Sequence, residues 1–185
     1  MKKIIILSAA LLGFNLASNA QTNATANANQ NVVLTLSNAI SISYSSTDNH
    51  TNGSDVTLPF TTVENYENGV TSSAQTLYVK SNKSFHVNVN TTSDKFSYTG
   101  SESSIAPDMM VADVLKAKIS NYNSGTAAST FASAFTALSN TSSSLLTGAT
   151  KGGDRQFDIT YKATPGFNFP SGTYTANVVY TATQD

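Results

Sequence analysis

The amino-acid sequence predicts an all-β fold: an antiparallel, immunoglobulin-like β-sandwich of about 7 to 9 strands with at most one short helix. Apolar and polar residues alternate with a period of two in several short segments, which is typical of strands that bury one face. Turn-forming sequences such as Asn52-Gly53 and Pro170-Ser171-Gly172 separate most of these segments. Short alternating strands joined by turns are the pattern of a sandwich.

The N-terminus has the features of a secretory signal peptide. Lys2 and Lys3 precede an apolar run over residues 4–13, and small residues follow up to Ala20, after which we expect cleavage. Residues 1–20 are therefore predicted to be a signal peptide, residues 21–31 a flexible polar leader, and residues 32–185 a single β-sandwich domain. An exported protein in the periplasm or at the extracellular cell surface follows from this organisation.

The expected strands follow the alternation along the chain. The first covers residues 32–36, where Val32, Leu34 and Leu36 share a face, and its pattern resumes over 39–44. Pro59 makes residues 56–63 an edge strand or an extended crossing. The remaining strands are expected over residues 74–80, 85–90, 96–99, 114–119, 156–163 and 172–183, although the composition of residues 109–119 would also tolerate a helix.

Two of these segments carry further expectations about pairing. Residues 74–80 and 85–90 are separated by a tight turn, which predicts a hairpin. In the closing strand, Tyr174, Ala176, Val178 and Tyr180 lie on one face, so this strand is expected to bury that face in a sheet. The terminal strands are expected at sheet edges, where contacts between subunits can form.

The segments between the strands are expected to be loops, with one exception. Residues 64–69, 101–108 and 139–153 are polar and lack alternation, although Leu145 and Leu146 within the last of them are expected to enter the core. Residues 128–138 place Phe131, Phe135 and Leu138 at helical spacing, so one short helix is expected there.

The composition excludes several classes of protein. Charged residues make up 11% of the chain and the net charge is -1, which gives no electrostatic basis for binding nucleic acid. The chain has no Cys, so neither disulfides nor thiol chemistry can contribute. After the predicted signal peptide, no apolar run reaches membrane-spanning length.

The residues that usually carry chemistry form no recognised pattern. His50 and His86 lack the spacing of a zinc site, and no nucleophile motif is present. A loose oxygen site using Asp48 and Asp55 remains an alternative, since the loop between them resembles a calcium loop only in part. We therefore expect a protein that is not an enzyme and has no cofactor, catalytic residues or metal site.

Exposed tyrosines offer a second kind of site. Tyr66 and Tyr122 lie in expected loops, where an aromatic ring could stack on a sugar, although core packing is the more common role of tyrosine. Asn-x-Ser/Thr triplets also match the glycosylation acceptor pattern, and their number is what an Asn- and Thr-rich chain produces by chance. They begin at Asn23, Asn49, Asn52, Asn82, Asn90 and Asn140.

The end of the chain resembles known bacterial surface modules. Residues 157–161, followed by the turn and strand from Pro170 to Thr181, are similar to the Gly-x-Tyr close of spore-coat-U-like and chaperone-usher fimbrial subunits, and more weakly to WxL-type surface domains. The resemblance implies a subunit whose fold is completed by a strand from a neighbour or a chaperone. The absence of Trp and of paired Cys departs from the WxL domains and from many pilins.

Together these features predict a secreted, non-enzymatic structural or adhesive component of the bacterial surface, such as a fimbria-like subunit or a matrix protein. Self-association or pairing with other surface subunits is expected through Val32, Leu34, Leu36, Tyr174, Val178 and Tyr180. A carbohydrate- or cell-wall-binding module that uses Tyr66 and Tyr122 is the alternative.

Overall fold

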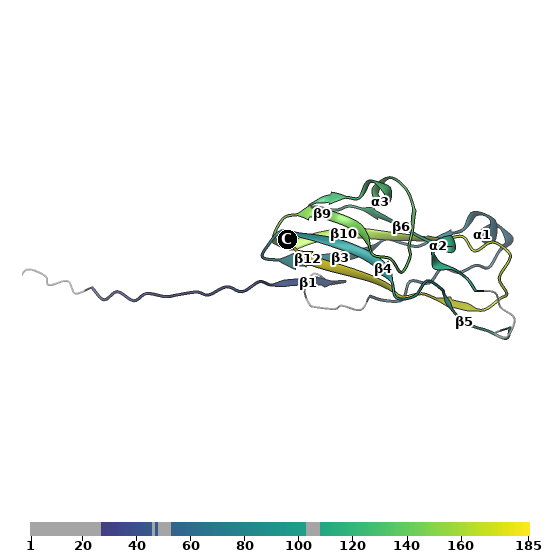
Figure 1. The fold of residues 1–185 in the computed structure, drawn as a ribbon, viewed down its shortest axis with the longest axis horizontal. Coiled ribbons are helices and arrows are strands. Elements are labelled where there is room, and N and C mark those ends of the chain that lie inside the picture. Colours follow the sequence, from purple (N-terminus) through teal and green to yellow (C-terminus); the bar gives the residue numbers. More distant parts are fainter. Residues whose placement is uncertain (1–26, 46, 48–52, 103–107) are drawn as a thin grey trace, which may run out of the picture. The chain divides into compact units, whose positions relative to one another are not determined.

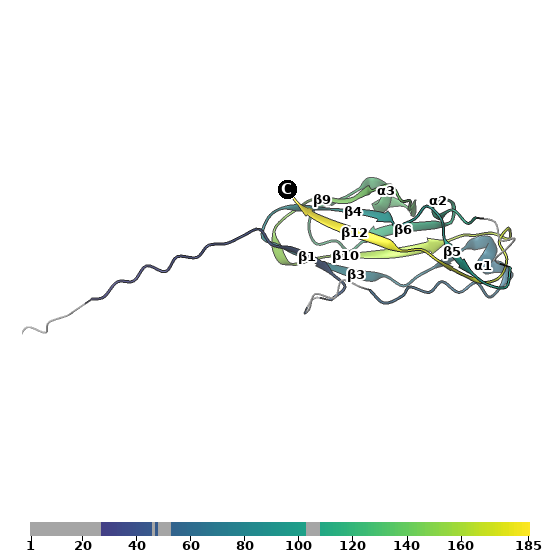
Figure 2. The same cartoon turned by 60° about the horizontal axis from the view of Figure 1, so that its bottom comes forward.

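The strands of this chain bury one face each, and they associate into two packed antiparallel sheets. The structure is a computed structural model that describes residues 27–45, 47, 53–102 and 108–185. It divides into one unit up to Leu36 and another, Ser37–Asp185, that contains all the described helices and strands. Figures 1 and 2 show the strands of the second unit running along its length. The all-β sandwich-like fold class is confirmed.

The first sheet has β10 near its centre and β1 at one edge. Its strand order is β1-β3-β10-β6-β8, and β2 also pairs with β10. All of these pairs are antiparallel. The strands are β1 (Ile40–Ser43), β2 (Val70–Thr71), β3 (Gln75–Ser81), β6 (Leu115–Ser120), β8 (Thr136–Ala137) and β10 (Gly152–Ala163).

The second sheet has the C-terminal strand β12 at its edge. Its order is β12-β4-β9-β7, and a separate two-stranded sheet pairs β11 with β5. The strands are β4 (Phe85–Thr91), β5 (Ser97–Thr99), β7 (Thr126–Ala127), β9 (Ser143–Ala149), β11 (Thr173–Thr175) and β12 (Val178–Gln184). Several of the twelve described strands have only two or three residues, so their number exceeds the 7 to 9 expected.

The core lies between the inward faces of the two sheets. Alternate residues of β3, β10 and β6 on one side and of β4 on the other are almost fully buried, as a period of two requires. The largest of these side chains are Phe85, Phe157, Leu77, Ile119 and Ile159. Without disulfides, this apolar contact and the sheet hydrogen bonds hold the fold.

Three short helices occur among the described residues, where one was expected. They are α1 (Val63–Asn68), α2 (Val111–Val114) and α3 (Ser129–Ser133), the last within the predicted helical segment. Helix α1 replaces an expected loop. Thr62 and Asn65 form a reciprocal capping box at its start, and Gly69 ends it at φ 78. Asn stands where the usual motif has Glu or Gln, so the signal was missed.

The expected hairpin between residues 74–80 and 85–90 was wrong. Both segments are strands, but β3 pairs with β1 and β10, whereas β4 pairs with β12 and β9. The turn between them carries the chain from one sheet to the other. Both strands still bury their alternating apolar residues, because they face each other across the core. Alternation predicts which face is buried but not which strand lies alongside.

The expected loop over residues 139–153 was also wrong, because it contains the central strand β9. The pairing of β9 with β4 shifts register around Val87, so that Leu145 is an extra residue between paired positions. Such a bulge lets Leu145 and Leu146 both be buried although they are adjacent. Their prediction as core residues is therefore confirmed, while the bulge and the Ser-rich flanks hid the strand.

The two terminal segments also differ from expectation. The closing segment 172–183 is two strands rather than one, because β11 pairs with β5 and β12 pairs with β4. Residues 32–36 form no strand. Residues 56–61 form no ladder either, so this stretch is an extended crossing. The predicted signal peptide over residues 1–20 lies outside the described residues.

The position of Leu145 in β9 gives a test of this core. Leu145→Ala should lower the free energy of unfolding by about 2 to 5 kcal/mol, because it removes buried methyl groups and leaves a cavity. Denaturant unfolding of the two proteins measures the difference. Val63→Ala, at a side chain that is 65% exposed, is the control and should change stability by less than about 0.5 kcal/mol. Equal effects of the two substitutions would contradict the placement of β9.

Candidate functional site

The edge strand β12 presents unpaired backbone groups on one side. Asn177 accepts a hydrogen bond from the Thr92 amide, and the Asp185 amide donates to Ser84. In an antiparallel ladder the backbone groups of alternate residues point to the same side, so the odd-numbered residues of β12 bond to β4. The N–H and C=O groups of Val178, Tyr180 and Ala182 therefore point away from β4. Within the described residues β12 pairs with β4 alone.

Strand β1 has the same arrangement at the edge of the other sheet. The Asn82 amide donates to the Ala39 carbonyl, which places residue 39 in a hydrogen-bonded pair with β3. The backbone groups of Ile40 and Ile42 therefore point away from β3. Strand β1 lies next to β12 at this side of the sandwich (Figure 2). We call the side formed by Ile40, Ile42, Val178, Tyr180 and Ala182 the open edge.

The core is incompletely covered along the open edge. Val87 and Val89 of the neighbouring strand β4 are at most 1% exposed, whereas Val178, Tyr180 and Ala182 of β12 are only partly buried. Ile40 is 37% exposed and Ile42 partly buried. Ile42, Val178, Tyr180 and Ala182 pack on the core cluster from its margin. Apolar side chains and free backbone groups therefore occur together here, which is the chemistry that another strand would satisfy.

One end of the open edge is held by the side chain of Gln184. Its Nε2 lies 2.9 Å from the carbonyl oxygen of Ala39, 2.9 Å from Asn82 Oδ1 and 3.0 Å from Ser81 Oγ. Asn82 also donates through Nδ2 to the carbonyl of Ser37. These bonds join the end of β12 to the start of β1, so the two strands are fixed relative to each other at this end.

The side chain of Tyr180 extends from the open edge into the core, where its hydroxyl meets that of Tyr161. The hydroxyls of Tyr161 and Tyr180 share a hydrogen bond of 2.7 Å, and the Tyr180 ring is also in contact with Phe157. Burial raises the pKa of Tyr161 from 10.0 to about 12. Burial likewise raises the pKa of Tyr180 well above 10.0. Each phenol satisfies the other, so both stay neutral inside an otherwise apolar core.

A shallow cavity of about 350 Å³ adjoins β1 at the end that Gln184 closes. Backbone and small side chains form most of its wall. Its lining residues are Ala39, Ile40, Ser41, Lys80, Ser81, Asn82, Gly152 and Gly153. The cavity leaves one side of Ile40 without packing, which agrees with the exposure of that side chain.

The residues predicted to contact other subunits occupy three different places. Val178 and Tyr180 are on the open edge, as expected for a terminal strand. Tyr174 is instead in β11, where it pairs with Tyr98 at a ring-centroid distance of 4.8 Å. Val32, Leu34 and Leu36 belong to the N-terminal unit and are at least 77% exposed. Their role as contacts remains a prediction.

The open edge also includes residues that sequence reasoning did not single out. Ile40, Ile42 and Ala182 form its apolar lining, and Gln184 closes one end. The alternation of Ile40 and Ile42 marked an inward face but gave no sign that their strand would lie beside the C-terminal strand. Only the strand order brings these residues together.

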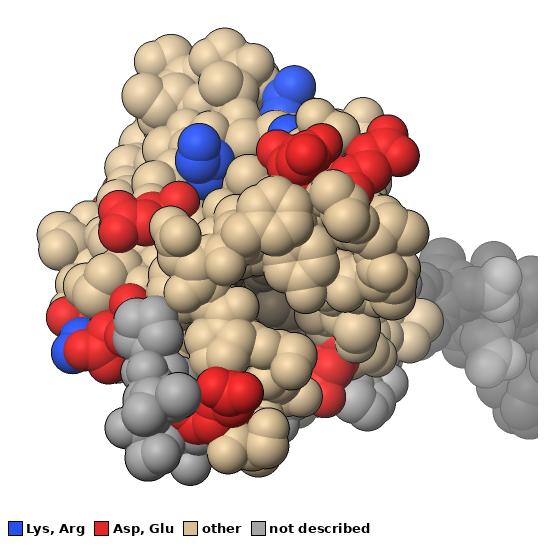
Figure 3. Space-filling view, turned by 90° about the vertical axis from the view of Figure 1, so that its right-hand side faces the viewer, with Lys and Arg blue, Asp and Glu red and all other residues tan. Residues whose placement is uncertain are grey.

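The two tyrosines predicted to bind glycans lie in different environments. Tyr66 in α1 is partly buried and stacks on Phe167, with ring centroids 5.3 Å apart, and Phe60 packs on it at 5.4 Å. Tyr122 is 41% exposed in a loop. Figure 3 shows the end of the molecule near α1, where charged side chains surround a hollow formed by uncharged residues. Glycan binding by either tyrosine remains a prediction.

The candidate ionic sites give little further chemistry. His86 Nδ1 lies 2.8 Å from Asp185 Oδ1 at the surface. His50 and Asp48 lie outside the described residues, as do residues 49, 51 and 52 of the calcium-like loop that would join Asp48 to Asp55. No group of three or more His, Cys, Asp or Glu side chains able to hold a metal occurs in the part of the chain that the structure describes. No described helix is long and apolar enough to cross a membrane.

The chain was compared with protein families, with curated proteins and with solved structures. No protein-family model and no curated protein matches the chain. Among solved structures it is similar to a chaperone-usher pilus studied for the uncoiling of its rod, at 13% identity and a TM-score of 0.38 over 90% of this chain and 100% of that one. It is also similar to the P pilus rod subunit PapA, at 13% identity and a TM-score of 0.36 over 79% and 99%.

Both similar structures are of pilus proteins. Because TM-scores below 0.5 do not establish a shared fold, the assignment of a β-sandwich depends on the sheets of the chain itself.

The tyrosine pair predicts how stability changes at high pH. A buried phenol with a raised pKa stabilises the folded state below pH 10.0, the usual pKa of tyrosine, and that stabilisation is lost as the pH rises through about 12. The unfolding midpoint, measured by thermal denaturation across this range, should therefore fall with pH. A protein with both Tyr161→Phe and Tyr180→Phe should show a shallower fall.

The same pair predicts a non-additive effect near neutral pH. Tyr161→Phe alone leaves the Tyr180 hydroxyl buried without its partner, which should cost about 1 to 3 kcal/mol. The double substitution removes both hydroxyls and should cost less than the sum of the single substitutions. Additive losses in denaturant unfolding would show that the hydroxyls do not depend on each other.

Proposed function

We propose that this protein is a non-enzymatic structural subunit of a fibre at the bacterial surface, in which the segment around Val32–Leu36 of one copy adds as a strand to the open edge of the next. The observation that carries the proposal is the open edge itself. There the backbone groups of Val178, Tyr180 and Ala182 and partly exposed core side chains lie together. An added strand would satisfy both at once.

The composition of the N-terminal segment supports its role as the added strand. Val33 and Thr35 separate Val32, Leu34 and Leu36. In an extended conformation these last three side chains therefore lie on one apolar face. All three side chains are highly exposed. Burying them would contribute roughly 5 to 9 kcal/mol in total, at about 1.5 to 3 kcal/mol each. The alanines that precede them would add little, so these three side chains dominate the contact.

The lengths of the two partners are also compatible. At about 3.3 Å per residue, the seven residues of β12 extend over roughly 23 Å, and the five residues 32–36 cover about 16 Å of that length. Since the segment needs no turn to lie along β12, it could pair over most of the open edge. Register would be fixed by its apolar face, because a slip of one residue would expose all three side chains.

Insertion between the two strands requires a small adjustment. Some Cα atoms of β1 and β12 lie within 8 Å of each other. A strand that pairs with both needs them about 9.6 Å apart, which is twice the spacing of neighbouring strands. Strand β1 pairs with β3 alone, and away from the end that Gln184 joins to β12 it would have to shift by roughly 2 Å or more. The exposure of Ile40 and the cavity beside it favour such a movement.

The place of assembly in this proposal follows from the predicted signal peptide over residues 1–20. An exported chain would meet other copies in the periplasm or at the extracellular surface, where open-ended addition of one copy to the next gives a fibre. A matrix or adhesive role is compatible with the same contact.

Substitutions on the two faces of the N-terminal segment test the proposal. Leu34→Asp should abolish assembly of residues 21–185, because a carboxylate would have to enter the apolar edge. Val33→Asp is the matched control, since Val33 is equally exposed but lies on the opposite face of an extended strand. Size-exclusion chromatography with light scattering measures the assemblies. Equal effects of the two substitutions would contradict strand addition.

The isolated second unit provides a complementation test. Residues 37–185 should remain monomeric, and a peptide of residues 29–38 added in excess should raise its thermal unfolding midpoint by occupying the open edge. The same peptide with Leu34→Asp should have no effect. If the shortened chain assembles like residues 21–185, the N-terminal segment is not the contact.

A proline substitution tests the edge from the other side. The amide of Ala182 points away from β4, so Ala182→Pro should leave the β12–β4 ladder intact and block assembly. Thr181→Pro removes a hydrogen bond to β4 and should destabilise the fold, by on the order of 1 to 3 kcal/mol. Thermal unfolding and light scattering of both proteins separate the two effects. Normal assembly of Ala182→Pro would exclude pairing along this edge.

A further inference from the structure

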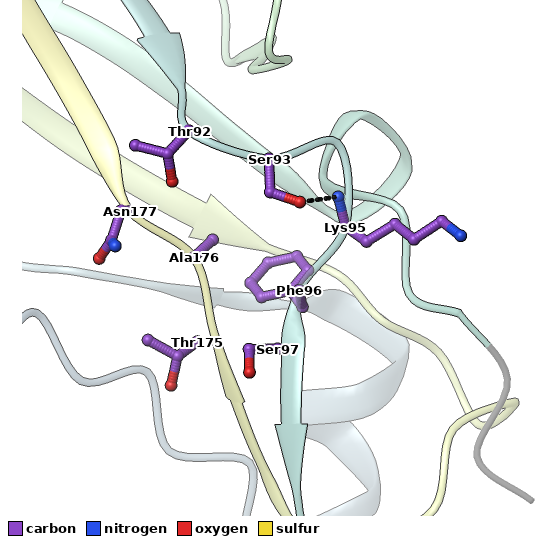
Figure 4. Close-up of a pocket in the computed structure, with 8 residues that line it drawn as sticks. All are labelled: Thr92, Ser93, Lys95, Phe96, Ser97, Thr175, Ala176 and Asn177. Carbon is purple, nitrogen blue, oxygen red and sulfur yellow. Dashed lines mark hydrogen bonds between the residues drawn. The ribbon is translucent and has the colours of Figure 1, made fainter.

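A surface cavity lies where the chain passes from one pair of strands to another. Thr92 bonds to Asn177 at the end of the β4–β12 ladder, and Ser97 pairs with Thr175 in the β5–β11 ladder. Between these points residues 93–96 lie opposite Ala176 alone. The longer of the two segments, residues 93–96, bends away from Ala176. A cavity of about 220 Å³ opens between the two segments (Figure 4). It is large enough for a small molecule rather than for single waters.

Uncharged hydrogen-bonding groups surround this cavity. Its lining residues are Thr92, Ser93, Lys95, Phe96, Ser97, Thr175, Ala176 and Asn177. Within the described residues the side chains of Thr92, Ser97, Thr175 and Asn177 make no hydrogen bond to protein, so three hydroxyls and one amide are free to bind a ligand. They come from both segments and lie around the same opening (Figure 4).

The base of the cavity is aromatic. Phe96 packs on the core, and its ring lies between the two groups of polar side chains, beside Ala176 (Figure 4). The Phe96 amide donates to the carbonyl of Met109, which fixes the backbone at this point. An aromatic ring with hydroxyl and amide groups around it matches the two sides of a sugar ring, whose C–H groups stack while its hydroxyls bond.

The cavity carries no free charge from the residues that line it. The one charged lining side chain, Lys95, points away from the opening (Figure 4). Its Nζ donates to Asp108 Oδ2 at 2.6 Å, and this hydrogen bond raises the pKa of Lys95, so the ammonium is held in an ion pair. The lining therefore offers no cation for a carboxylate or phosphate and no anion for a basic ligand.

We propose that this cavity is a binding site for one neutral sugar ring in the pyranose form. The ring would stack on Phe96 and exchange hydrogen bonds with Thr92, Ser97, Thr175 and Asn177. The site shares no lining residue with the open edge, although Asn177 directly precedes Val178 in the chain. It also differs from Tyr66 and Tyr122, which do not line the cavity.

Saturation-transfer NMR on residues 21–185 tests the site, because it works on monomers and on assemblies. The probes are the methyl glycosides of glucose, galactose and mannose, with sialic acid as a charged comparison. At least one neutral glycoside should show saturable transfer. Immobilised oligosaccharides that end in the same sugar form a second arm: binding there identifies a glycan terminus as the ligand, and binding to the methyl glycoside alone identifies the free sugar.

Two substitutions that keep the shape of the site assign the binding to it. Thr175→Val and Asn177→Leu each remove hydrogen-bonding groups, and each should weaken binding by about tenfold, the value of one good hydrogen bond. Thr183→Val is the matched control on the same closing segment, and it should leave affinity unchanged. Thermal unfolding checks that all three proteins are folded.

Several results would overturn the proposal. They are the absence of saturable transfer from every neutral glycoside, tighter binding of sialic acid than of the neutral sugars, and equal losses with Thr183→Val and Asn177→Leu. Loss of binding with Tyr66→Ala or Tyr122→Ala but not with Asn177→Leu would place the binding site at the tyrosines predicted from the sequence. Assembly measured in the same samples reports separately on the open edge.

Discussion

The structure depends on apolar contact between two sheets that no disulfide joins. Phe85 and Val87 of β4 face Phe157 and Leu77 of the other sheet, and all four are at most 1% exposed. Because the chain has no Cys, the cost of ordering it is offset by this burial and by the ladders on either side. At the edge of each sheet, the core side chains are less covered and the backbone groups on the outer side have no strand to pair with. The edges are therefore the places where this fold can interact.

The edge strands of the two sheets, β1 and β12, lie at the same side of the sandwich. Strands β1 and β12 both turn the backbone groups of their core-facing residues away from their neighbours. Gln184 joins one end of this side, and the Tyr161 and Tyr180 hydroxyls satisfy each other beneath it. A strand added here would complete the core and both ladders. The surface cavity at Phe96 shares no lining residue with this edge, and its one charged lining side chain, Lys95, is held by Asp108.

The alternation of apolar and polar residues predicted strands correctly wherever burial of one face decides the conformation. The alternation in β3, β4, β6 and β10 predicted these strands and their inward residues, since a period of two places every second side chain on one face. It failed where a local feature breaks the period. The bulge at Leu145 hid β9, and the capping box at Thr62 used Asn65 in an unusual position, which hid α1.

The sequence by itself determined that this chain is an all-β protein without disulfides and which side chains enter its core, because composition and periodicity are properties of neighbouring residues. Only the tertiary structure decided the partners. Residues 75–81 and 85–91 look like a hairpin, yet they lie in different sheets, and the open edge joins Ile40 to Val178 across almost the whole chain. Strand order is set by long-range packing of whole faces, which no short window of residues contains.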